Sequence, residues 1–225
     1  MVDERLRAAE LLRVLKFFYS FNELSAVLGI PGQVLWRYAS MRVVPERCTA
    51  RRIVEAVESG LLPRLYRELP VGPASLQAPL NPGVVELAAM DCAEWCRERL
   101  GRIDHVACIG DPWGSALGAA IARMLKTRLL ILPAQPVPVN GYTAEAWSCG
   151  PRGPCGVILA PRGHTVRGGR LLLAAFIAWC RAEVEAAAGL LRRQGYSVAG
   201  IYAYTAPAGS LPEPSRILKP WSHPP

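Results

Sequence analysis

The spacing of hydrophobic residues divides the chain into two parts. Over residues 1–60, apolar residues recur every three or four positions. This predicts helices over residues 4–18, 23–28 and 49–59, with a further helix opened by Pro31. From Pro82 onward, helical patterns alternate with short apolar runs. They predict helices over 84–100, 116–126 and 182–194, and strands over 105–109, 128–132, 156–160, 171–175 and 198–204.

The segment between these two parts, residues 61–81, is rich in proline and has no hydrophobic period, which predicts a linker. We therefore expect a helical domain over 1–60, a linker over 61–81, and an α/β domain over 82–225 that ends in a proline-rich tail. Alternating strands and helices predict a mainly parallel sheet flanked by helices, with ligands bound outside the carboxyl ends of the strands.

The helical part contains a pattern that predicts a helix-turn-helix. Asn22 is a predicted N-cap, Gly29 supplies the left-handed residue of a tight turn, and Pro31 opens the second helix. Five positions are expected to be buried between the helices: Leu24, Leu28, Ile30, Leu35 and Tyr38. The alternative is an ordinary helical bundle with a glycine turn.

The exposed face of the second helix carries the residues predicted to contact double-stranded DNA. Gln33, Trp36 and Arg37 share this face, and Arg42 follows it at a position suited to a phosphate. Glutamine and arginine can read adenine and guanine edges through two hydrogen bonds. The net charge of +8 agrees with a polyanionic partner.

Other features of the composition limit the possible locations. No apolar run approaches the ~20 residues that a membrane span requires, and the N-terminal segment does not look like a signal peptide. We therefore expect a cytoplasmic protein with no membrane partner. The seven cysteines show no metal-binding spacing, so no metal or cofactor is predicted. Cys149 and Cys155 are close enough in sequence to form a disulfide, although such bonds are unusual in cytosol outside hyperthermophiles.

The turn predicted after residues 171–175 lacks the expected chemistry. In an α/β protein such a turn commonly holds a phosphate, using glycine or acidic residues. Here the chain reads "AAFIAWC", from Ala174 to Cys180. The strand–turn–helix arrangement of a phosphosugar site is therefore predicted, whereas the glycine and acidic residues that usually bind the ligand are missing.

Residues 82–206 resemble the type I phosphoribosyltransferases. "HVACIGDPWGSALGAAIARML" matches their strand, pyrophosphate loop and helix, and "YTAEAW" occupies the place of the hood that closes over substrate. "TVRGGRLLLAAFIAWC" and "GYSVAGIYAY" complete the pattern. With "LWRYAS" and "RVVPE" near the N-terminus, the whole chain resembles archaeal regulators that join a helix-turn-helix to a phosphoribosyltransferase domain.

The resemblance implies a carboxylate pair that binds the ribose of phosphoribosyl pyrophosphate, and a threonine- and glycine-rich turn that wraps its 5′-phosphate. In a gap-free register, Ala174 and Ala175 occupy the carboxylate positions, and Trp179, Cys180 and Arg181 lie in the turn. Alanine cannot accept hydrogen bonds from ribose, and the loss of two charge-assisted bonds costs several kcal/mol, at roughly 1.5–3 each. This predicts an inactive site, although Arg181 could still attract an anion.

The loop that corresponds to the pyrophosphate loop has two interpretations. Gly110, Asp111, Trp113, Gly114 and Ser115 could present amides to an anion, or they could form a plain strand–helix turn in which Asp111 bonds locally. We expect the plain turn, because the carboxylate of Asp111 repels anions.

Five further polar or aromatic residues stand out in the sequence. Tyr142, Glu145 and Trp147 could form a lid, cover an apolar pocket or belong to a dimer surface. His105 and His164 are expected to be structural, since neither has a visible acid or nucleophile partner.

The main functional hypothesis is a DNA-binding transcription regulator. In it, a catalytically inactive phosphoribosyltransferase-like domain forms a homodimer or senses a nucleotide or nucleobase ligand. The second hypothesis is an active nucleobase phosphoribosyltransferase, of purine or orotate type. The third is a scaffold whose helices bind protein.

Overall fold

The computed structural model describes residues 3–133, 141–151, 153–161 and 168–222. It consists of two compact units. The N-terminal unit comprises Met1–Leu69 and Ala78–Val84, and the C-terminal unit comprises Pro70–Gln77 and Val85–Pro225. The segment predicted as a linker is therefore shared between the two units.

The N-terminal unit is helical. Its helices are α1 (Glu4–Leu15), α2 (Phe21–Leu28), α3 (Gly32–Ala39), α4 (Arg47–Ala56) and α5 (Leu62–Glu68), with a π-helical turn over Val57–Leu61. α1 packs against α3 and α4, and α2 packs against α3. Gly29 ends α2 with φ of 65°, in the left-handed conformation that glycine adopts without cost.

The start of α2 differs from the prediction. Ser20, and not Asn22, is the N-cap: its hydroxyl accepts a hydrogen bond from the Glu23 N–H, and the Glu23 carboxylate accepts one from the Ser20 N–H. This capping box satisfies two amides, whereas Asn22 lies inside the helix. Leu24, Leu28, Ile30 and Leu35 are buried as predicted. Tyr38 is only half-buried, and the neighbouring Ala39 is buried in its place.

The predicted linker contains regular structure. α5 occupies Leu62–Glu68, with Pro63 in its first turn, and a 3-10 helix spans Gly72–Leu80. Pro63 is compatible with the first turn of α5 because the first amides of a helix have no intrahelical acceptor. A lack of hydrophobic period therefore did not mean a lack of helix.

The C-terminal unit holds the strands and their helices. After α6 (Pro82–Trp95) and a π-helical turn (Cys96–Leu100), the chain forms β1 (His105–Gly110), α7 (Pro112–Leu125) and β2 (Arg128–Pro133). A hairpin follows, made of β3 (Tyr142–Ser148) and β4 (Cys155–Pro161). The unit ends with β5 (Arg170–Ile177), α8 (Arg181–Arg193), β6 (Ser197–Pro207) and β7 (Ser215–Trp221).

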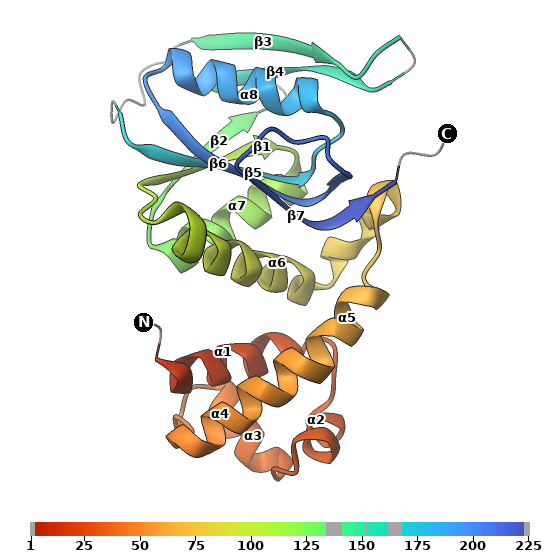
Figure 1. Cartoon of the computed structure of the whole chain (residues 1–225), viewed down its shortest axis with the longest axis vertical. Helices are drawn as coiled ribbons and strands as arrows, with labels where there is room; N and C mark the ends of the chain where they lie inside the picture. Colours follow the sequence, from red (N-terminus) through yellow and green to blue (C-terminus); the bar gives the residue numbers. More distant parts are fainter. Residues whose placement is uncertain (1–2, 134–140, 152, 162–167, 223–225) are drawn as a thin grey trace. The chain divides into compact units, whose positions relative to one another are not determined.

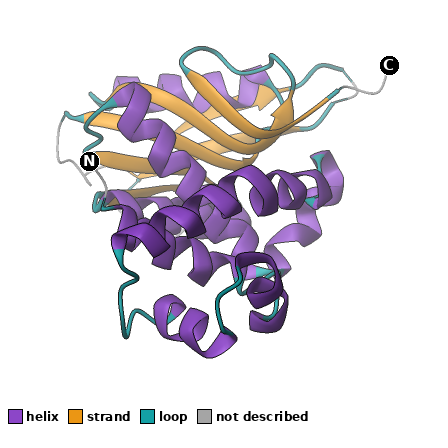
Figure 2. Ribbon diagram, turned by 60° about the horizontal axis from the view of Figure 1, so that its bottom comes forward, coloured by secondary structure: helices purple, strands orange, loops and turns teal. Residues whose placement is uncertain are grey.

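Five strands form one parallel sheet in the order β2-β1-β5-β6-β7, and β3 and β4 form a separate antiparallel pair. In Figure 1, α8 and the β3–β4 hairpin lie above this sheet, and α6 and α7 lie below it. Figure 2 shows the central strands between these helical layers. The mainly parallel α/β sheet predicted from the sequence is confirmed.

Side chains alternate across β5 between the two faces of the sheet. Leu171, Leu173 and Ala175 belong to the buried cluster that includes the apolar face of α8. Phe176 points to the other face and stacks on Tyr204, with ring centroids 4.5 Å apart. All residues of β5 after Arg170 are buried, as expected for a central parallel strand.

Candidate functional site at the carboxyl edge of the sheet

Strand β5 extends beyond its predicted end, and this changes the position of the two alanines. Ala174 lies opposite Cys108 and Tyr202 in the sheet, and Ala175 lies opposite Ala203. Both are buried inside the strand, on opposite faces of the sheet. The turn predicted from residue 174 begins only after Ile177, so these two positions do not form a loop.

The turn between β5 and α8 consists of Ala178, Trp179 and Cys180. The Ala178 N–H donates to the Thr205 carbonyl oxygen, which fixes the turn to β6. Cys180 is the N-cap of α8 and provides no side-chain cap. Arg181 is exposed and forms an ion pair with Glu185 at 2.6 Å, so its charge is compensated.

A buried carboxylate occupies the start of α8. Glu183 is 4% exposed, and its Oε2 accepts a hydrogen bond of 2.8 Å from the Trp179 N–H. Burial raises the pKa of Glu183 to about 7; the Trp179 N–H opposes this shift, and the nearby Asp111 carboxylate adds to it. Sequence reasoning missed this residue because an acid in the first turn of a helix is common for electrostatic reasons alone.

Asp111 follows the neighbouring strand β1 at the same edge of the sheet. It is the N-cap of α7, and its Oδ1 accepts a hydrogen bond of 2.6 Å from the Gly114 N–H. Burial raises its pKa, while hydrogen bonds from the Gly114 and Trp113 amides oppose the shift. The first amides of α7 are thus bound to the protein's own carboxylate, as in the plain turn weighed above.

Two glycines allow this loop to lie close to the sheet. A Cβ on Gly110 would lie 2.2 Å from the Leu132 carbonyl oxygen, and a Cβ on Gly114 would lie 2.2 Å from the Ile109 carbonyl oxygen. Both neighbours are backbone atoms and cannot move aside. Trp113 and Ser115 are half-buried on the first turn of α7. The loop is therefore a tight strand–helix connection that carries one carboxylate, Asp111, to the edge.

A disulfide joins the hairpin to this edge, and it differs from the predicted one. Cys149 pairs with Cys180, with Cα atoms 5.7 Å apart, while Cys155 is free and exposed. The prediction relied on sequence proximity, but the hairpin pairs Ser148 with Cys155, and the chain fold brings Cys180 to Cys149. The end of β3 is thus covalently bonded to the turn that precedes α8.

The rest of the hairpin also packs against α8. Trp147 is half-buried against the core, with its ring next to Gly156, and Glu145 forms an ion pair with Arg193 of α8. Of the three arrangements weighed for this segment, the position of Trp147 agrees with the cover of an apolar core.

The remaining polar candidates lie elsewhere. His105 is buried at the start of β1, with its ring edge toward Tyr196 at 5.4 Å between centroids. His164 lies outside the described residues. Across the described ranges, no three histidine, cysteine, aspartate or glutamate residues come close enough to hold a metal.

The whole chain was compared with known proteins. No protein-family model and no curated protein matches it in sequence. Solved structures do match. Adenine phosphoribosyltransferase from Thermoanaerobacter pseudethanolicus superposes with a TM-score of 0.54 at 14% identity, over 65% of this chain and 86% of that one. The enzyme from Rhodothermus marinus gives 0.53 at 22% identity, over 62% and 81%.

A third adenine phosphoribosyltransferase, from Saccharomyces cerevisiae and bound to an imino-altritol bisphosphate and adenine, gives a TM-score of 0.50 at 14% identity, over 65% and 81%. This chain has a type I phosphoribosyltransferase-like fold. The similarity comes from the parallel sheet with its helices, and the predicted fold class is confirmed to that extent.

The main functional hypothesis is corrected by these comparisons. The similar structures are adenine phosphoribosyltransferases, so the prediction of a DNA-binding transcription regulator with an inactive domain is wrong, and the alternative is better supported. The prediction assumed that the site's carboxylates must stand at Ala174 and Ala175. The phosphoribosyltransferase-like unit instead carries Asp111 and Glu183 at its carboxyl edge.

The residues predicted to contact DNA lie in the N-terminal unit. Gln33, Trp36 and Arg37 are exposed on α3, and the guanidinium of Arg42 lies over the Trp36 ring at 4.6 Å. The structure thus brings Trp36 and Arg42 together. None of the helices in the described ranges has the length and apolar composition needed to cross a bilayer.

Proposed function

We propose that this protein is a nucleobase phosphoribosyltransferase of nucleotide metabolism that acts on a purine base, with adenine as the first candidate. The fold and its adenine phosphoribosyltransferase neighbours support this proposal. The observation that carries it is local: two carboxylates, the buried Glu183 and the half-buried Asp111, follow adjacent parallel strands at the edge where α/β proteins bind ligands.

In the proposed reaction, a bond forms between a ring nitrogen of the base and C1′ of the ribose. The bond between C1′ and pyrophosphate breaks, and pyrophosphate leaves with the electron pair. The base nitrogen loses its proton. Glu183 is suited to accept this proton, because its pKa of about 7 makes it a general base near neutral pH.

Asp111 has a different role in this proposal. Its carboxylate can accept hydrogen bonds from the ribose hydroxyls, and it thereby replaces the acidic pair that positions 174 and 175 lack. Magnesium carried on the donor's pyrophosphate would be held by Asp111, since Mg²⁺ is usually bound by one or two carboxylates together with substrate phosphates.

Substrate binding is expected to release Glu183. The Trp179 N–H, which now donates to Glu183, belongs to the turn that the resemblance assigns to the 5′-phosphate. A phosphate oxygen would replace the Glu183 carboxylate at this amide. The freed carboxylate would then be available to the base.

The experiment is a transferase assay with adenine, phosphoribosyl pyrophosphate and magnesium. We expect wild-type turnover and a loss of about 10²-fold or more in kcat for Glu183→Gln. Glu185→Gln is the matched control: it lies half a turn away on α8, is exposed, and should keep wild-type kcat. Equal kcat for wild type and Glu183→Gln would show that Glu183 takes no part in the chemical step.

We propose that α2, the turn at Gly29 and α3 form a helix-turn-helix, as in the archaeal proteins that the chain resembles. We also propose a homodimer in the cytoplasm, and sedimentation equilibrium tests the oligomeric state. A disulfide such as Cys149–Cys180 is unusual in that compartment outside hyperthermophiles.

A further inference from the structure

A cavity lies at the opposite edge of the sheet from the candidate active site. Its volume is about 620 Å³, within the ~300–1,000 Å³ typical of small-molecule sites. The start of β5 contributes Arg170, and the start of β7 contributes Ser215 and Arg216. Arg99, from the π-helical turn after α6, completes its polar wall. All these residues belong to the C-terminal unit.

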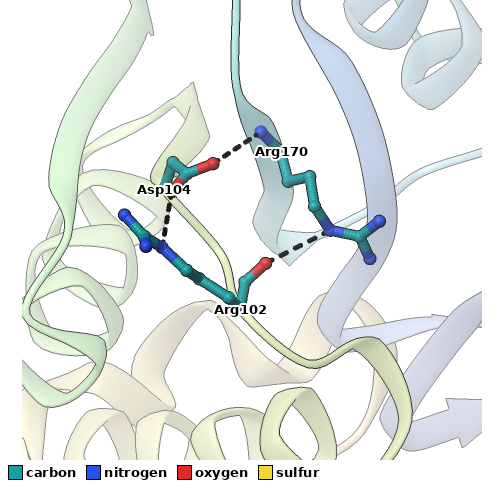
Figure 3. A network of polar contacts seen from close by, with 3 residues as sticks. All are labelled: Arg102, Asp104 and Arg170. Carbon is teal, nitrogen blue, oxygen red and sulfur yellow. Dashed lines mark hydrogen bonds and ion pairs between the residues drawn. The ribbon is translucent and has the colours of Figure 1, made fainter.

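The arginine at the centre of this wall is held in position by its surroundings. The Asp104 carboxylate accepts hydrogen bonds from the Arg170 backbone N–H at 3.1 Å and from Arg102 Nε at 3.0 Å (Figure 3). The Arg170 guanidinium donates to two carbonyl oxygens, those of Arg102 at 3.2 Å and Leu100 at 2.7 Å. It is therefore fixed in place without a carboxylate partner of its own among the described residues.

The charges around the cavity favour an anion. Arg216 is compensated by a two-point contact with the Asp91 carboxylate. Arg99 is exposed and forms no ion pair with any carboxylate in the described part of the chain. Among the described residues that line the cavity, Glu213 is the one acidic residue, and it accepts a hydrogen bond from the Ser215 N–H. The cavity is thus lined by two guanidinium groups without a carboxylate partner among the described residues, those of Arg99 and Arg170, and by one carboxylate, that of Glu213.

The remaining wall of the cavity is apolar. Trp95, Leu100, Ala199 and Pro214 form it, and Trp95 is fixed by its packing against Tyr202. A cavity of this volume is much larger than an inorganic phosphate. The apolar wall suits an uncharged organic group attached to the anion, because such surface gains stability when it leaves water.

We propose that this cavity binds a phosphate-bearing small molecule of nucleotide size, at a second site separate from the carboxyl edge. Arginine is the residue best suited to phosphate, because its planar guanidinium can donate two parallel hydrogen bonds. Arg99 and Arg170 contact the phosphate in this arrangement, and the organic group lies against Trp95. The proposal does not depend on transferase activity.

The test uses the full-length protein with AMP, inorganic phosphate and adenosine as separate ligands. Binding is followed by the indole N–H resonances of tryptophan in two-dimensional NMR. The Trp95 signal, assigned through Trp95→Phe, reports on the cavity, while the Trp179 signal reports on the proposed active site. We expect AMP to shift the Trp95 signal and to bind there more tightly than either of the other two ligands.

Arg99→Gln should weaken this binding about tenfold or more, as expected for the loss of a charge-assisted contact. Arg97→Gln is the control, because Arg97 is exposed on the same π-helical turn and does not line the cavity. A Trp95 signal that AMP leaves unchanged would overturn the proposal, even if the Trp179 signal shifts. If adenosine binds as tightly as AMP, the phosphate does not contribute to binding, and this part of the proposal is wrong. If inorganic phosphate binds as tightly as AMP, the organic group does not contribute, and that part is wrong.

Discussion

The buried carboxylate of Glu183 predicts an unusual dependence of stability on pH. In the unfolded chain its pKa is near 4.5, while in the folded protein burial raises it to about 7. Between these two values the folded protein retains a proton that the unfolded chain has released. Stability must therefore fall as pH rises from about 4.5 to about 7.

The size of this effect follows from the same two values. The difference between 4.5 and about 7, at about 1.4 kcal/mol for each pH unit, corresponds to about 3 kcal/mol. Glu183→Gln removes the titration, and the glutamine oxygen can still accept from the Trp179 N–H. The variant should match the wild type at pH 4.5 and exceed its free energy of unfolding by about 3 kcal/mol at pH 8.

Urea unfolding of both proteins, followed by circular dichroism from pH 4.5 to pH 8, measures this difference directly. Glu185→Gln serves as the control, because it removes an exposed carboxylate and should change stability by only about 0.5 kcal/mol at any pH. A constant difference between Glu183→Gln and the wild type across the range would refute the argument. A gain in stability at pH 8 together with lost turnover would indicate that Glu183 is kept for function at a cost in stability.

Two further predictions concern the connections of the site. Cys149→Ser should lower the free energy of unfolding by about 4 kcal/mol under non-reducing conditions, because the disulfide closes a loop of 31 residues. Cys155→Ser, which removes a free cysteine, should have no effect in the same urea titration. Equal stability of the two variants would show that Cys149 is not disulfide-bonded in solution. Gly114→Ala should destabilise the protein by at least about 1–3 kcal/mol, because its Cβ would lie 2.2 Å from the Ile109 carbonyl oxygen. Gly60→Ala, whose Cβ meets nothing within 4 Å, should leave the thermal midpoint unchanged or raise it; similar losses in both variants would contradict the close packing of α7 on β1.

The strands of the main sheet were predictable from sequence where they are fully buried. β1 and β5 are continuous apolar runs because a central parallel strand is covered on both faces. β7 was missed because Pro220 lies within it. Proline is tolerated there because, among the described strands, β7 lies at the edge of the sheet and pairs with β6 alone. β3 was missed because its sequence, YTAEAWS, contains no continuous apolar run.

The candidate site was less predictable, because it depends on contacts between distant residues. Glu183 resembles any acid near a helix start, and only its burial beside Asp111 makes it unusual. The partner of Cys149 depends on the position of the hairpin relative to α8, which spacing along the chain does not encode. The alanines at 174 and 175 were identified correctly as a departure from the resembling enzymes, but their place inside β5 required the strand register.

In the proposed reaction, this protein transfers a phosphoribosyl group to a purine base. The most direct measurement is the formation of AMP and pyrophosphate from adenine and phosphoribosyl pyrophosphate, with magnesium at pH 8, where Glu183 is ionised. We expect equal amounts of both products, and a rate that falls as pH decreases through about 7, because Glu183 is then protonated and cannot accept the proton. A folded, disulfide-bonded protein that forms neither product with adenine or any other purine base would contradict this expectation.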